Sequence, residues 1–206
     1  LADDQGPKGA IPSYIPCRMP SNNEDRDGGP AWADAVVICP WTVHLAFGDE
    51  RILERHYEQL RRFVNFMESR STHLVRADEH YVKSGGYGDW VSMDAPAGER
   101  VGATPKDLIG TAYFAHVAGL VAEIARRLGR EADADELDAL RGRVVEAFRR
   151  EFVTPSGRLV GNTQTAYVLA LAFDLLPEPM RPAAVERLVR MLERRNWRLS
   201  TGFVGT

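Results

Sequence analysis

A chain of 206 residues, of which 44 % are hydrophobic and 27 % charged, is long enough to bury a sizeable core and has the composition of a globular protein. Its formal net charge of −3, with both signs interspersed, excludes the basic footprint of a nucleic-acid-binding protein. No uninterrupted apolar run approaches the roughly 20 residues that cross a bilayer, so we expect neither nucleic acid nor membrane as a partner.

Two cysteines, Cys17 and Cys39, are too few for a disulfide framework, and no CxxC or HxxxH spacing indicates a metal site. We therefore expect both cysteines to be buried as small hydrophobic side chains, and we expect no metal or cofactor. The chain begins at Leu1 without an initiator Met or a signal peptide. This start predicts a piece of a longer protein and leaves cytoplasm and secretion equally open.

Residues 1–30 hold most of the turn-forming Gly, Pro and Asn residues and predict a loop-rich opening segment. Six helices in three pairs are then predicted: Ala31–Phe47 with Glu50–Arg70, Thr104–Leu128 with Ala132–Phe152, and Thr163–Leu176 with Pro179–Arg195. Thr104 and Thr163 are the expected N-caps of their helices. The connections within each pair are only a few residues long, so each pair should form an antiparallel hairpin.

The two helices of each pair differ in composition. The second helix is amphipathic, with an apolar stripe and a charged face, whereas Ala31–Phe47 and Thr163–Leu176 are almost uncharged and should be buried all round. This alternation predicts an all-α fold of hairpins in two layers, with the uncharged helices inside. Three hairpins make about half of a closed toroid of six. We therefore expect residues 1–206 to be a single partial domain, or one that self-associates through its exposed inner helices; an open solenoid is the weaker alternative, because no repeat of fixed period is present.

The connection from Ser71 to Ala103 is too long to be a simple linker, which favours a functional role. Its centre, Gly85-Gly86-Tyr87-Gly88-Asp89-Trp90, combines flat aromatic faces with a carboxylate, as a sugar site requires; a structural loop around a packed Trp90 is the alternative. Three further clusters lie at 30–35, with Trp32 and Asp34, at 163–167 and at 200–203. Because the inner helices should all start at one mouth of the toroid, we expect the four clusters to converge on one pocket.

No Ser/His/Asp arrangement, nucleophile elbow or phosphate loop is visible in the sequence. The five histidines are scattered along the chain. His44 and His116 fall on apolar helix faces, which predicts core histidines rather than ligands.

In combination, the motifs resemble the catalytic domain of glycoside hydrolase family 78, the bacterial-type α-L-rhamnosidases. The matching words are GPAWADA at 29–35, PWT at 40–42, GDERILERHY at 48–57, YGDW at 87–90, TPKDLIGTAY at 104–113, NTQTAYVLALAF at 162–173 and STGFVGT at 200–206. The resemblance covers nearly the whole chain. It implies a six-hairpin (α/α)6 toroid and hydrolysis of terminal α-L-rhamnosides with inversion, so the expected partner is a rhamnose-containing glycoside or oligosaccharide.

The same resemblance implies substrate contacts for Trp32, Asp89 and Trp90, with Asp34 and Tyr87 nearby. In that family, however, the general acid lies upstream of the first matching word and the general base downstream of the last, so no catalytic residue is expected in this chain. Asp34 and Asp89 are expected to bind hydroxyl groups rather than to transfer protons. A non-catalytic sugar-binding or scaffold module, or a six-hairpin glycosidase for another sugar, stays open as an alternative.

Overall fold

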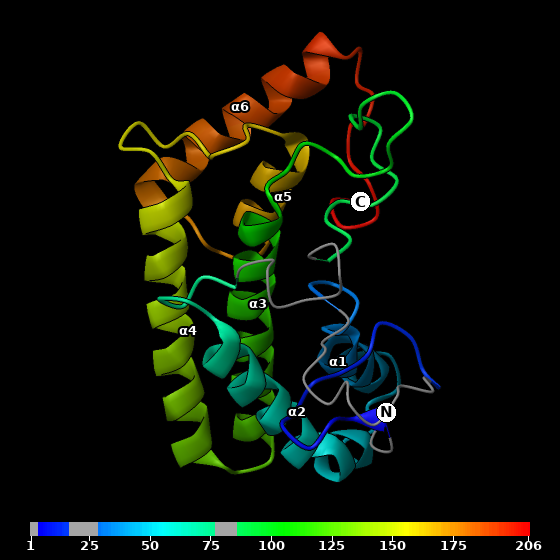
Figure 1. Cartoon of the computed structure of the whole chain (residues 1–206). Helices are drawn as coiled ribbons and strands as arrows, with labels where there is room; N and C mark the ends of the chain where they lie inside the picture. The colour runs from blue at the N-terminus through cyan, green and yellow to red at the C-terminus, as the bar shows by residue number, and fades with distance from the viewer. Residues whose placement is uncertain (1–3, 17–28, 77–85) are drawn as a thin grey trace.

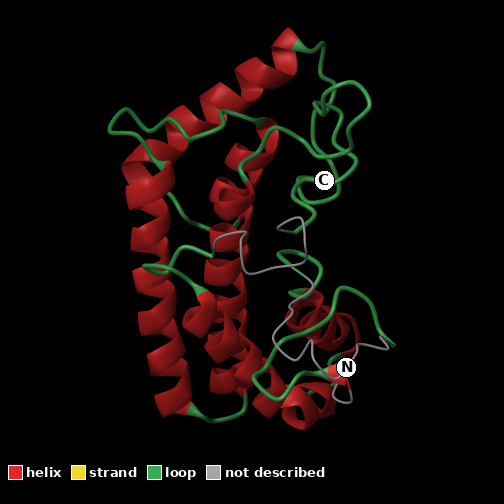
Figure 2. Ribbon diagram, in the orientation of Figure 1, coloured by secondary structure: helices red, strands yellow, loops and turns green. Residues whose placement is uncertain are grey.

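The computed structural model describes residues 4–16, 29–76 and 86–206. Its helices are α1 (Ala35–Phe47), α2 (Arg51–Arg70), α3 (Lys106–Arg127), α4 (Glu131–Phe152), α5 (Gln164–Ala172) and α6 (Arg181–Arg194), with a short 3-10 helix η3 (Glu178–Met180) before α6. Within the described ranges the only β contacts are three isolated bridges, and helices are the main element (Figure 2). The prediction of an all-α fold with six helices is confirmed.

Two helix boundaries differ most from the predicted ones, for a local backbone reason. The chain at Ala31 has a left-handed φ of 70°, so residues 31–34 form turns and α1 begins only at Ala35. Asp174 has a φ of 57°, which ends α5 at Ala172 and not at Leu176.

The two predicted caps have different outcomes. The Thr163 hydroxyl accepts a hydrogen bond from the Ala166 N–H and caps α5 as expected. Thr104 does not cap α3, which starts after Pro105; its hydroxyl instead pairs with the Thr163 hydroxyl at 2.7 Å. This bond joins the loop before α3 to the start of α5.

The helices form hairpins α1–α2, α3–α4 and α5–α6, and α3 occupies the centre (Figure 1). It contacts α1, α2, α4 and α5, and most of its apolar side chains are fully buried. The amphipathic α2 buries its stripe of Leu53, Tyr57, Leu60, Val64 and Met67 and leaves its charged face outside. The inner position of the less charged helices therefore holds for α3 and α5, whereas α1 leaves Leu45 and Phe47 exposed at its end.

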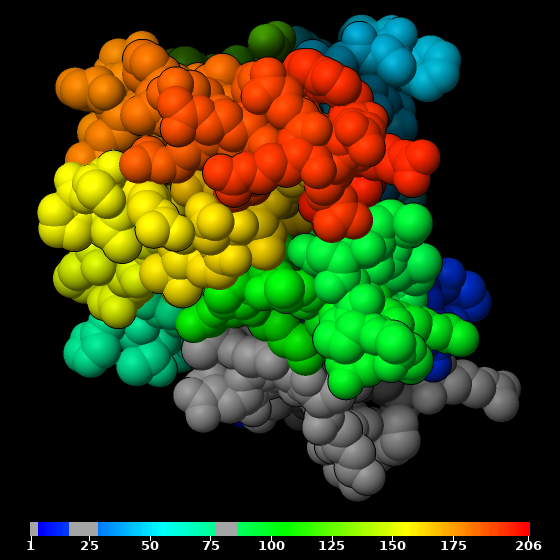
Figure 3. Space-filling view, turned by 90° about the horizontal axis from the view of Figure 1, so that it is seen from above, coloured from blue at the N-terminus to red at the C-terminus, as the bar shows by residue number. Residues whose placement is uncertain are grey.

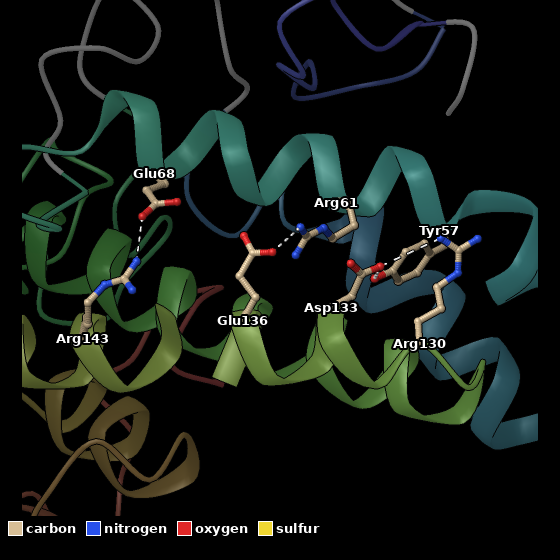
Figure 4. A network of polar contacts seen from close by, with 7 residues as sticks. All are labelled: Tyr57, Arg61, Glu68, Arg130, Asp133, Glu136 and Arg143. Atoms are coloured by element: carbon tan, nitrogen blue, oxygen red, sulfur yellow. Dashed lines mark hydrogen bonds and ion pairs between the residues drawn. The ribbon is translucent and has the colours of Figure 1, made fainter. Parts of the chain in front are cut away.

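Polar contacts connect the two outer helices α2 and α4 (Figure 4). Arg61 pairs with Glu136 and Glu68 with Arg143, while the Tyr57 hydroxyl donates to Asp133 at 2.8 Å. Burial, and then this hydrogen bond, raises the pKa of Tyr57. The exposed ion pairs each contribute no more than about 1 kcal/mol, so the register of α2 on α4 depends mainly on the apolar stripe beneath them.

Three sequence expectations about single residues can be compared with the structure. Cys39 is exposed, so the prediction that it is buried is wrong, because it lies with Thr42, Val43 and Ala46 on an exposed face of α1; Cys17 lies outside the described residues. His44 is buried as expected. His116 is half-buried and stacks on Phe173, with ring centroids 4.0 Å apart.

By length and composition α3 is the one helix, in the part of the chain that the structure describes, that matches a membrane-spanning segment. The sequence did not indicate a membrane-spanning helix here, because polar residues interrupt the apolar runs of α3. The most apolar window of α3 is 72 % buried inside the fold, as expected for the central helix of a helical domain.

Candidate functional site

The four polar and aromatic clusters predicted from the sequence meet at one end of the helices. The loop 86–103 lies beside the chain segment 198–206 in both views (Figures 1 and 3). Backbone hydrogen bonds join them: the Phe203 N–H donates to the Trp90 carbonyl at 2.7 Å and the Met93 N–H to the Thr201 carbonyl at 3.3 Å. These contacts bring two of the four predicted clusters together, and the convergence of all four on one pocket stays a prediction.

An aromatic cluster of Trp32, Tyr87, Trp90 and Phe203 lies at this junction. Ring centroids of Trp32 are 4.6 Å from Tyr87 and 4.8 Å from Phe203, and Tyr87 meets Trp90 edge-on at 5.8 Å. The first three rings are half-buried, and Phe203 is 63 % exposed. The cluster is therefore held by packing on one side and open on the other, as an aromatic platform for a ligand must be.

Asp89 is fully buried next to this platform. Its Oδ2 accepts hydrogen bonds from the Thr165 hydroxyl and the Gly202 N–H, and its Oδ1 accepts one from the Val204 N–H. One carboxylate thus ties the loop 86–103 to the start of α5 and to the segment 198–206. Residue 202 must be Gly for this approach, because a Cβ there would lie 2.4 Å from the Trp90 carbonyl oxygen and 2.8 Å from Asp89 Oδ1.

Asp34 is also fully buried, in the turn that precedes α1. Both of its oxygens accept hydrogen bonds from Arg76 Nη1, at 2.8 and 2.9 Å, and Oδ2 also accepts the Ala31 N–H at 2.6 Å. Arg76 is fully buried as well, and its N–H donates to the Thr111 hydroxyl on α3. The ion pair compensates both buried charges. Because Asp34 also bonds to the Ala31 N–H, these contacts hold the turn that contains Trp32.

Sequence reasoning missed two of the residues around the site. Arg76 follows α2 within the long connection, and no local pattern links it to Asp34 at a sequence separation of 42. Tyr113 is on α3, where its spacing marks it only as an apolar residue. Burial, followed by the charges of Asp34 and Asp89, raises the pKa of Tyr113, so it stays protonated at neutral pH beneath both carboxylates.

All five predicted site residues are among the described residues and lie around this junction. Trp32, Tyr87 and Trp90 contact one another as a chain of rings. The charges of Asp34 and Asp89 both act on Tyr113, and both carboxylates are hydrogen-bonded within the protein. Their binding of substrate hydroxyls stays a prediction. Within the described residues no group of His, Cys, Asp and Glu side chains has the geometry of a metal site.

Comparison with known proteins places this geometry in a family. An α-L-rhamnosidase of Streptomyces avermitilis is 37 % identical over 206 residues, and one of Alteromonas sp. is 33 % identical over 211 residues. Both alignments cover 100 % of this chain but only 18 % and 22 % of the relatives, so the chain spans about a fifth of their length.

Solved structures agree with the sequence relatives. The crystal structure of the Streptomyces avermitilis α-L-rhamnosidase complexed with L-rhamnose superposes with a TM-score of 0.85, covering 100 % of this chain and 18 % of that one. The native α-L-rhamnosidase of Aspergillus terreus superposes with a TM-score of 0.83 at 27 % identity, covering 99 % of this chain and 24 % of that one. The bacterial alpha-L-rhamnosidase six-hairpin glycosidase domain matches residues 1–206, and the chain belongs to this family.

Proposed function

We propose that this chain is part of the catalytic domain of a glycoside hydrolase that removes terminal α-L-rhamnose with inversion, and that it supplies the sugar-binding residues. The observation that carries the proposal is the aromatic cluster of Trp32, Tyr87 and Trp90 above two buried carboxylates. A relative with the same helical fold is described in complex with L-rhamnose, which supports a rhamnose-containing glycoside as the substrate.

The chemistry of the cluster fits a sugar ring. Aromatic faces pack against the C–H groups of a pyranose and exclude water, and carboxylates accept hydrogen bonds from its hydroxyl groups. A carboxylate offers roughly four acceptor positions. Asp34 and Asp89 each accept three hydrogen bonds within the chain and are fully buried, and their binding of a sugar hydroxyl stays a prediction.

The proton transfers are assigned to other parts of the full-length protein. Inverting hydrolysis uses two carboxyl groups about 6.5–9.5 Å apart, one on each side of the glycosidic bond. Both oxygens of Asp34 accept hydrogen bonds from Arg76, and Asp89 accepts three hydrogen bonds from within the chain. Because both carboxylates are bonded within the chain, we assign binding to this chain and the general acid and base to the remainder of the ring.

The test uses the full-length enzyme and an aryl α-L-rhamnoside. The wild-type protein should release the aryl group, and NMR of the first-formed rhamnose should show the β anomer, which is the product of inversion. Trp90→Ala should lower kcat/KM by at least about tenfold, because the aromatic platform is a binding contact. Trp197→Ala is the matched control, because Trp197 is 66 % exposed and lies outside the cluster.

Thermal unfolding of the same variants separates the sugar-binding role from a structural one. A tryptophan that only fills the core costs about 3–5 kcal/mol of stability when truncated to alanine. If Trp90→Ala unfolds much more easily and the folded fraction retains wild-type kinetics, the sugar-platform role is rejected. Absence of turnover on any α-L-rhamnoside by the wild-type enzyme would reject the proposed activity itself.

A further inference from the structure

A pocket lies between the start of α5 and the end of α6. Its volume is about 280 Å3, close to the lower bound of roughly 300 Å3 for small-molecule sites, which suits a single sugar residue. The polar residues that line it include Asp94, Asn162, Gln164, Arg194, Arg195 and Ser200. The end of α6 and the start of α5 lie at the end of the fold where the segment 198–206 meets the loop 86–103 (Figure 1).

The pocket is electropositive. Arg194 and Arg195 are exposed, and within the described residues neither guanidinium has a hydrogen bond or an ion pair. By contrast, Arg190, one turn earlier on α6, is paired with Glu186. The N-terminal end of α5 adds a partial positive charge to the pocket. Two unpaired guanidinium groups favour a carboxylate, which matches their planar arrangement of donors.

The pocket also carries groups for hydroxyls. Asp94 uses its Oδ1 for the Ser92 hydroxyl and the Ala103 N–H, while its second oxygen has no partner among the described residues. The Asn162 side chain accepts from the Tyr167 hydroxyl through its carbonyl oxygen, which leaves its NH2 group to donate. A ligand with one carboxylate and several hydroxyls matches this combination better than an inorganic anion, because its hydroxyl groups can also bond to Asp94 and Asn162.

The pocket and the aromatic cluster share the same two segments of chain. Asp94 is four residues after Trp90 in the loop 86–103, and Ser200 is three residues before Phe203. The hydrogen bonds from Met93 to Thr201 and from Phe203 to Trp90 hold these segments together. A glycan whose terminal sugar lies on the aromatic cluster therefore passes close to Arg194 and Arg195 with its next residues.

We propose that the pocket lined by Arg194 and Arg195 binds the carboxylate of a uronic acid residue in the glycan that carries the terminal rhamnose. This inference rests on the proposed function and deepens it, since it names the class of glycan from which rhamnose is removed. Recognition of the acidic sugar raises kcat/KM for such glycans over neutral ones.

The experiment compares two substrates with the full-length enzyme: rhamnosyl-galacturonate and its carboxyl-reduced analogue rhamnosyl-galactose, which differ only in the carboxylate. The wild-type ratio of kcat/KM, acidic over neutral, should exceed one. Arg194→Gln/Arg195→Gln should lower that ratio by about tenfold or more, because each lost bond to a charged group is worth a factor of this order. Arg190→Gln removes one arginine charge from α6 outside the pocket and should leave the ratio unchanged.

A wild-type ratio of one or below, or an equal fall of the ratio in Arg190→Gln, would overturn the uronate site while rhamnose release still supports the proposed function. Titration calorimetry with free D-galacturonate gives a readout independent of turnover. Binding that is lost in the double variant supports the site even if no rhamnoside is hydrolysed. Binding of inorganic sulfate without binding of galacturonate would contradict the inference. Thermal midpoints equal to wild type are expected, since neither arginine has a partner to lose.

Discussion

Asp89 connects three segments that are far apart in the sequence, since its partners Thr165 and Gly202 are 76 and 113 residues away. Asp89→Asn would turn an NH2 group toward donors that now bond a carboxylate oxygen. We expect it to destabilise this junction by about 1.5–3 kcal/mol, the range for a hydrogen bond to a charged group. Thr165→Val removes one donor only and should cost less.

Hydrogen exchange of the Gly202 and Val204 amides in the intact enzyme measures this local opening directly. Both amides donate to Asp89 and should exchange faster in Asp89→Asn than in Thr165→Val. If their protection is unchanged in Asp89→Asn while sugar binding is lost, Asp89 acts only through the substrate and not through the junction.

His116 should make the stability of the domain depend on pH. Burial lowers the pKa of His116 below its ordinary value of 6.5; Asp34 opposes the shift and Arg141 adds to it. The unfolded chain therefore binds the proton first as the pH falls. The contribution of His116 to the free energy of unfolding is complete above pH ~6.5 and is lost as the pH falls toward the folded pKa, by at most about 1.4 kcal/mol per pH unit.

Denaturant unfolding between pH 7.5 and 5 tests this expectation with His116→Gln. The variant loses the stack on Phe173 and so starts less stable, but its stability should fall less steeply below pH 6.5 than that of the wild type. His73, which is exposed, provides the control when it is replaced by Asn. Parallel pH profiles for His116→Gln and the wild type would show that His116 has the same proton affinity folded and unfolded.

At the scale of elements, the contact between the loop 86–103 and the segment 198–206 depends on a glycine. Gly202→Ala puts a Cβ against the Trp90 carbonyl and the Asp89 carboxylate, both of which are held by other bonds, so the segments must separate. We expect a loss of about 1–3 kcal/mol, typical of overpacking.

Gly142→Ala is the opposite case on α4, because a Cβ there meets no atom within 4 Å and the residue is inside a helix. This change should stabilise the protein by roughly 0.5–1 kcal/mol. Chemical denaturation of both variants should therefore give shifts of opposite sign. A Gly202→Ala protein as stable as the wild type would mean that the two segments are not locked together.

At the scale of the molecule, the C-terminal end of α1 exposes apolar side chains that no other described element covers. Leu45 is 62 % and Phe47 79 % exposed, and Val43 lies close by on the same helix. A monomer rarely leaves such a surface in water. We expect the isolated chain to self-associate and, if the general acid and base lie outside it as proposed, to have no rhamnosidase activity.

Sedimentation velocity tests this expectation with Leu45→Glu/Phe47→Glu, which should shift the isolated chain toward monomer. Val185→Glu alters an exposed apolar residue on α6 and should leave the association state unchanged. A wild-type chain that sediments as a single monomeric species would contradict the prediction. Turnover of an aryl α-L-rhamnoside by the isolated chain would return Asp34 or Asp89 to consideration as catalytic groups.

Much of the fold was predictable because its causes are local. Side chains three and four residues apart share a helix face, so the stripe from Leu53 to Met67 is visible in the sequence and is buried in the structure. Short connections around Gly48 and Gly129 dictate antiparallel hairpins for the same reason. The aromatic and acidic residues of the site were recognisable because they cluster at loops and helix starts.

The remainder depended on contacts between residues distant in the sequence. No periodic pattern pairs Arg76 with Asp34, because the two residues are 42 positions apart in the sequence. They meet only because the folded backbone brings their segments together. The exposure of Cys39 likewise follows from which faces of α1 have a neighbour, and an apolar helix has the same sequence whether or not its partner is present. The pocket around Arg194 and Arg195 forms because the end of α6 lies beside the start of α5 in the folded chain.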